Sequence, residues 1–96
     1  MDVSTIWRQF FQNWPQGIPR SGVVVTTFGD QIAFVSYLSS NDLVILERRA
    51  PDAVGGRKVV LPYEKIDAVK FVDSIPSSTL EAAGFASGPQ AKPKSA

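Results

Sequence analysis

The strongest structural signal in this chain is the run GVVVTTFGDQIAFVSYL, residues 22–38. β-Branched and aromatic residues, which favour strands, dominate this run. Gly29 and Asp30 interrupt it with the chemistry of a two-residue hairpin turn, and glycine in the first position favours type II′. The pattern therefore predicts two antiparallel strands, at residues 23–28 and 31–38.

Three more strands are predicted farther along the chain. A polar turn at residues 39–42 precedes a strand at residues 43–49, whose Leu-Val-Ile-Leu run indicates burial on both faces. A loop containing proline and glycine, residues 50–56, separates it from strands at residues 57–61 and 66–72. Five short consecutive strands indicate an antiparallel meander, and we expect it to curl into a small barrel.

An amphipathic helix is predicted upstream of the strands. Its aromatic residues lie at i, i+3, i+4 and i+7, the spacing of one helical face: Trp7, Phe10, Phe11 and Trp14. Pro15 disfavours helical geometry at Trp14, so the predicted helix covers residues 5–13. Four aromatic rings cannot stay solvated, and we expect them to pack in the core, with a partner chain or a ligand as the alternative.

The C-terminal part of the chain carries weaker signals. Residues 78–81 have the spacing of a capping box, and Gly84 is placed to end a short helix. Residues 86–96 lack the apolar side chains needed to offset the entropy of ordering and are predicted to be a disordered tail. Residues 1–85 are then predicted to be a single domain.

The composition restricts the chemistry. The chain has 96 residues with no Cys and no His, which excludes disulfides, thiolate nucleophiles and imidazole ligands. Its carboxylates are dispersed over turns and form no recognisable catalytic or metal-binding pattern. We therefore predict a protein that is not an enzyme and needs neither a cofactor nor a metal ion.

Charge and hydropathy bear on partners and location. Lys92 and Lys94 are two of the ten basic residues, so residues 1–91 carry eight basic and nine acidic side chains. Bulk charge therefore does not favour nucleic acid or anionic lipid. No apolar run is long enough for a membrane span, and Asp2 and Arg8 are unlike a signal peptide, so the expected location is cytoplasmic.

The order of one helix followed by five strands resembles the Sm-like family of small barrels, which includes LSm and Hfq-like proteins. The local resemblance is best at residues 22–25, GVVV, at the Gly29 turn, at residues 41–47, NDLVILE, and at residues 60–66, VLPYEKI. It implies an N-terminal α-helix followed by a five-stranded antiparallel Sm-like or SH3-like barrel. The family's bend glycine is replaced here by residues 33–35, Ala-Phe-Val, so the curvature is expected to need another device.

The resemblance also implies a homo-oligomer, in which the strands on either side of the turn at residues 62–65 pair between neighbouring subunits. An apolar edge strand without a charge or a proline at its middle supports this independently, because it is a template for another chain. The predicted interface residues are Val59, Val60, Leu61, Ile66 and Val69.

Four cations flank the long loop: Arg48, Arg49, Arg57 and Lys58. A hairpin brings them together, and two interpretations stay open. They contact an anion such as an RNA phosphate, or they form a solvated hairpin end neutralised by Glu47 and Asp52.

Tyr63 follows Pro62 in a turn beside Lys65, and it is the aromatic ring most expected to be exposed. Stacking on a base and anchoring of the loop are equally open for this ring, and Lys65 adds a cation beside it. The predicted function is a homo-oligomeric binding module with single-stranded RNA as the candidate ligand. The alternative is a module for protein interaction or assembly that binds no nucleic acid.

Overall fold

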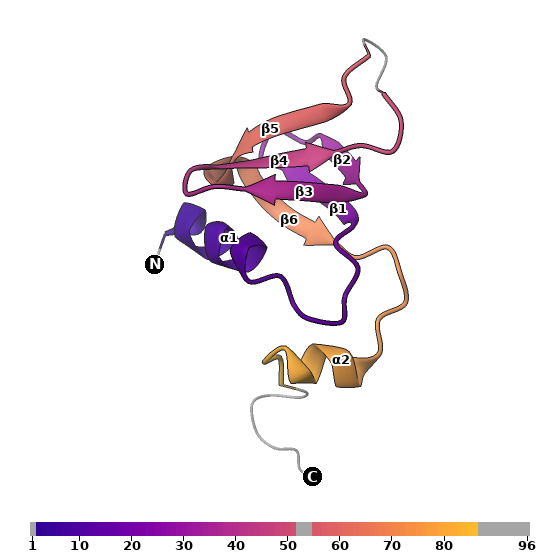
Figure 1. The fold of residues 1–96 in the computed structure, drawn as a ribbon. Coiled ribbons are helices and arrows are strands. Elements are labelled where there is room, and N and C mark those ends of the chain that lie inside the picture. The colour runs from indigo at the N-terminus through magenta and orange to yellow at the C-terminus, as the bar shows by residue number, and fades with distance from the viewer. Residues whose placement is uncertain (1, 52–54, 87–96) are drawn as a thin grey trace.

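The computed structural model describes residues 2–51 and 55–86 and is mainly β (Figure 1). In chain order its elements are α1 (Val3–Gln12), β1 (Gly22–Thr26), β2 (Gln31–Phe34), β3 (Ser36–Ser39), β4 (Leu43–Glu47), β5 (Lys58–Pro62), the 3₁₀ turn η1 (Tyr63–Lys65), β6 (Ile66–Lys70) and α2 (Ser77–Ala82). The strands form two antiparallel three-stranded sheets with the orders β2-β1-β6 and β3-β4-β5.

The prediction of a closed five-stranded barrel is wrong. The described residues contain six strands in two sheets, and no strand pairing among them closes the sheets into a barrel. The predicted strand at residues 31–38 is divided at Val35, whose N–H donates to the Glu47 carbonyl at 2.8 Å while Ser36 also pairs with Glu47. Two residues opposite one form a β-bulge, which bends the chain from the first sheet into the second. This bulge is the bending device used in place of a glycine.

The first hairpin also differs from the prediction. Gly29 N–H donates to the Thr26 carbonyl at 3.1 Å, and Gly29 has a φ of 91°. The connection between the hydrogen-bonded Thr26 and Asp30 is therefore a three-residue loop with glycine in the left-handed region, rather than a two-residue type II′ turn.

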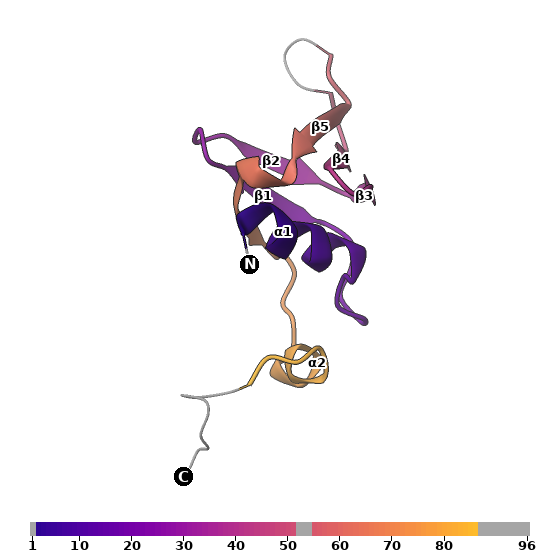
Figure 2. The same cartoon turned by 90° about the vertical axis from the view of Figure 1, so that its left-hand side faces the viewer.

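The core lies between the two sheets and α1 (Figure 2). Phe11 is 1% exposed, and its ring contacts those of Phe34, Tyr37 and Tyr63. Trp7, Phe10 and Trp14 pack around this core as partly buried neighbours. The prediction that the aromatic face of the helix belongs to the protein's own core is therefore confirmed.

Both ends of α1 are capped by side chains. Asp2 Oδ1 accepts from Thr5 N–H at 2.9 Å, so the helix begins two residues before the predicted start, and this hydrogen bond lowers the pKa of Asp2. At the other end, the Phe11 carbonyl would normally accept from the N–H of residue 15, which is a proline and has none. The Tyr37 hydroxyl donates to this carbonyl instead.

Helix α2 lies apart from the two sheets in both views, at the end of the segment that follows β6 (Figures 1 and 2). None of its residues is buried. A short helix is present here, as residues 78–81 and Gly84 indicated, but it begins at Ser77 after Pro76 and lacks the side-chain hydrogen bond of a capping box. The predicted disordered tail, residues 86–96, lies outside the described residues except for Ala86.

Candidate assembly and ligand-binding surfaces

Strands β5 and β6 lie at the ends of their sheets, and each pairs with one neighbour among the described residues. Arg48 N–H donates to the Arg57 carbonyl at 2.8 Å, one step beyond the Glu47–Lys58 pair of the register. Hydrogen-bonded and non-hydrogen-bonded pairs alternate in antiparallel strands. Because Arg48–Arg57 is a hydrogen-bonded pair, Ile45–Val60, three pairs farther along, is a non-hydrogen-bonded pair. The backbone N–H and C=O of Val60 therefore point away from β4.

The same alternation applies to β6. Thr26 N–H donates to Asp30 toward β2, and Thr27 N–H donates to Lys65 toward β6. Val24 therefore directs its backbone to β2, and its partner Val69 directs its N–H and C=O away from β1. The two sheets thus each have an edge whose backbone groups face outward.

The predicted interface residues divide between these edges and the core. Val60 is 55% exposed, and Val59 and Val69 are half-buried. The side chains of Leu61 and Ile66 are buried, at 4% and 1% exposed. The latter two hold the edges in place, while Val60 and Val69 present the outward-facing backbone.

The long loop does bring cations together. Arg48 and Arg57 face each other across the hairpin, whereas Lys58 faces Glu47 and its Nζ lies 3.0 Å from Glu47 Oε2. No other ion pair is formed among the described residues. The guanidinium groups of Arg48, Arg49 and Arg57 therefore have no acidic partner there. Of the two acidic residues expected to neutralise the cations, Glu47 pairs with Lys58, and Asp52 lies outside the described residues.

The expectation that Tyr63 is exposed is wrong. The 3₁₀ turn after Pro62 directs its ring into the core, where it is 1% exposed, and its hydroxyl donates to the Ser40 carbonyl at 2.7 Å. Burial raises the pKa of Tyr63 above its usual value. Its ring is therefore not available to a base, while the neighbouring Lys65 side chain is exposed.

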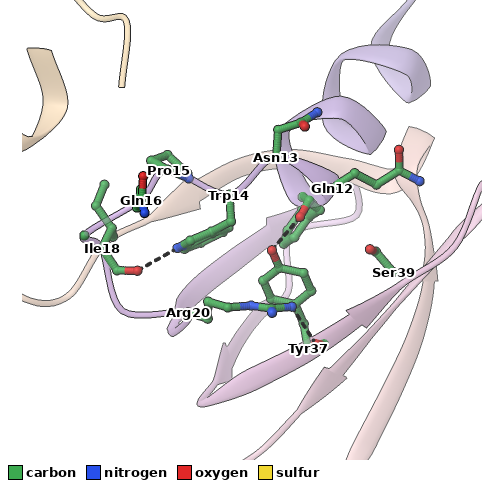
Figure 3. A pocket seen from close by; sticks show the side chains of 11 residues that line it. Gln12, Asn13, Trp14, Pro15, Gln16, Ile18, Arg20, Tyr37 and Ser39 are labelled. Atoms are coloured by element: carbon green, nitrogen blue, oxygen red, sulfur yellow. Dashed lines mark hydrogen bonds between the residues drawn. The ribbon is translucent and has the colours of Figure 1, made fainter. Parts of the chain in front are cut away.

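A cavity of about 450 Å³ between the end of α1 and β3 is lined by Trp14 together with residues that the sequence analysis did not single out, among them Ile18 and Arg20 (Figure 3). Trp14 Nε1 donates to the Ile18 carbonyl at 3.0 Å. The Arg20 guanidinium lies 4.0 Å from the Tyr37 ring centroid and donates to the Tyr37 carbonyl at 3.0 Å. Burial raises the pKa of Tyr37, and the charge of Arg20 opposes that rise. These contacts join the segment after α1 to β3.

Among the described residues, no three Asp or Glu side chains gather where they could hold a metal ion. No helix among the described residues is both long enough and apolar enough to cross a lipid bilayer. Comparison of the chain with protein-family models, with curated proteins and with solved structures gives no match.

Proposed function

We propose that this protein is a non-catalytic binding module that assembles with copies of itself, as the resemblance to the Sm-like family implies, by pairing β5 of one copy with β6 of the next. The observation that carries the proposal is the pair of outward-facing edges at Val60 and Val69. An open edge with apolar residues is a template for another strand. Because the two edges differ, such pairing is head-to-tail and can close into a ring.

The flanking residues support this use of β5. Lys58 and Pro62 stand at its two ends, and both residue types discourage pairing with another chain. The middle of the strand, Val59 to Leu61, has neither device. The part of the edge that has neither a charged residue nor a proline is thus the part where the backbone of Val60 faces outward.

Oligomeric mass tests the proposal. We expect the chain to sediment at a multiple of 10.4 kDa, and the Val60→Pro variant to sediment as the monomer, because proline removes the outward N–H and leaves pairing with β4 intact. The matched control is Ala33→Pro, which removes an N–H that points away from β1 on the edge of β2 and should keep the wild-type mass. A wild-type chain that stays monomeric at high concentration, or a Val60→Pro variant that keeps the wild-type mass, would contradict the proposal.

Binding of single-stranded RNA is the second candidate function, after self-assembly. It is supported by the three arginines at the hairpin end that lack an acidic partner among the described residues. Phosphate contacts by Arg48, Arg49 and Arg57 would give a logarithmic salt dependence with a slope of roughly −2, since each contact to a single strand contributes about −0.7. Anisotropy titrations of a labelled oligouridine at several salt concentrations measure this slope. Binding that is absent at low salt, or that survives replacement of all three arginines by Gln, removes this candidate. The cytoplasmic location stays a prediction.

A further inference from the structure

A second hollow lies on the outer face of the sheet β2-β1-β6, beside the hairpin end. It has a volume of about 450 Å³, and its apolar lining includes Val23, Ala33, Val35 and Val72. Val35 and Val72 are 39% and 64% exposed. We call this hollow the β2 groove.

The two sides of the β2 groove differ in charge. Arg48 and Arg49 line it on the side of the hairpin end, and Asp73 lines it beyond β6. The Arg48 Nε donates to the Ala50 carbonyl at 3.4 Å, and neither arginine has an acidic partner among the described residues. A ligand with carboxylates therefore finds unneutralised guanidinium groups on one side, while Asp73 can accept from backbone N–H groups on the other.

The lining also distinguishes between classes of ligand. Single-stranded RNA is usually bound by stacking of its bases on exposed aromatic rings. The only aromatic residue in the lining is Phe34, which is 2% exposed and belongs to the core. Aliphatic side chains next to guanidinium groups suit aliphatic and acidic side chains of a peptide instead.

We propose that the β2 groove binds an acidic peptide segment of a partner protein, with aliphatic side chains against Val23, Ala33 and Val35 and carboxylates at Arg48 and Arg49. The inference is independent of self-assembly, since β5 and β6 contribute none of the lining residues. The groove is therefore expected to bind its peptide in the monomeric Val60→Pro variant as well.

Fluorescence anisotropy with three labelled peptides tests the contribution of the carboxylates and that of the aliphatic side chains. The probe is GSEVELEV, and the matched controls are GSQVQLQV, which lacks the charges, and GSEGEGEG, which lacks the aliphatic side chains. We expect the probe to bind and each control to bind about tenfold more weakly or worse, because each lacks one set of contacts. Equal binding of the probe and the glycine control would overturn the proposal, since the groove would then contribute nothing.

A pair of variants separates the groove from general electrostatic attraction. Arg49→Glu and Arg57→Glu make the same charge change at the same hairpin end, but only Arg49 lines the groove. We expect Arg49→Glu to weaken the probe by about tenfold or more, the loss typical of a charged hydrogen bond, and Arg57→Glu by less than about twofold. Equal losses would contradict the assignment.

A competition experiment and a third variant complete the test. Ala33→Glu places a carboxylate in the floor of the groove on an exposed strand position, and it should abolish binding of the probe without lowering the thermal midpoint. An eight-nucleotide oligouridine should not displace the peptide at moderate salt. If the oligouridine binds more tightly and displaces it, the arginines serve RNA and the proposal fails.

Discussion

At the level of single residues, the Tyr37 hydroxyl has a specific structural task. It donates to the Phe11 carbonyl, which Pro15 leaves without the usual helical donor. Tyr37→Phe keeps the ring and removes the donor, so a buried acceptor loses its partner. We expect the variant to unfold in urea with a free energy about 1–3 kcal/mol lower than wild type. A loss that cannot be measured would show that the helix end is satisfied in another way.

The two tyrosines also predict how stability depends on pH. Burial raises the pKa of Tyr37 and of Tyr63, so the unfolded chain loses these protons first, near pH 10. The unfolded state then binds fewer protons than the folded state, and stability falls as the pH rises above about 10.

Urea unfolding at pH 9 and pH 11 measures this loss, and the double variant Tyr37→Phe, Tyr63→Phe is the control. The chain has only these two tyrosines, so a spectroscopic titration of tyrosinate follows both groups directly. A titration near the usual value in the folded protein would contradict the burial of both rings.

Side-chain placement was only partly predictable from the sequence. The helical spacing of Trp7, Phe10 and Phe11 correctly indicated a core face, because a regular stripe has one buried side. The position of Tyr63 did not follow from its neighbours, since one 3₁₀ turn decides whether the ring points inward or outward. Tyr37 lies in the predicted second strand, but its role depends on a carbonyl 26 residues away in the sequence.

At the level of elements, Gly22 allows β1 and β6 to approach each other. A Cβ at this position would lie 2.4 Å from the Lys70 carbonyl oxygen, which belongs to the backbone and cannot rotate away. Gly22→Ala should lower the unfolding free energy by about 1–3 kcal/mol, the usual cost of overpacking. It should also speed amide exchange at Val23, which is paired with Lys70.

The matched control for Gly22→Ala is Gly29→Ala. A Cβ at Gly29 meets nothing within 4 Å, but its φ of 91° costs an alanine about 1–2 kcal/mol. This variant should leave exchange in the β1–β6 pair unchanged. Equal effects of the two substitutions on the amide of Val23 would show that the close approach at Gly22 is not what limits this pairing.

Whether a segment forms a helix or a strand was predicted well, but the residues at which the helices and strands end were predicted less well. The bulge at Val35 was missed because its cause is not a local residue type such as glycine: two residues must share one partner, Glu47, on another strand. The predicted third strand, residues 43–49, ends instead at Glu47, and the fifth, residues 66–72, ends at Lys70. Propensity alone does not report where pairing stops.

At the scale of the whole molecule, the separation into two sheets explains the candidate surfaces. The bulge turns β2 into β3, so β5 and β6 become outer strands of different sheets. The β2 groove lies beside the same change of direction, between Val35 and the chain after β4. The sequence indicated the cations at this end, but it could not indicate the groove, because residues from four separate segments line it.

Amide hydrogen exchange at Val60 and Val69, measured over a range of protein concentrations, tests self-assembly most directly. Both N–H groups point away from their partner strands within one copy. If β5 pairs with β6 of another copy, their exchange slows as the concentration rises and approaches that of Val59 and Ala68, whose N–H groups point toward a strand of the same copy. If Val60 and Val69 exchange as fast as loop amides at every concentration, the edges remain unpaired and the proposed assembly does not form.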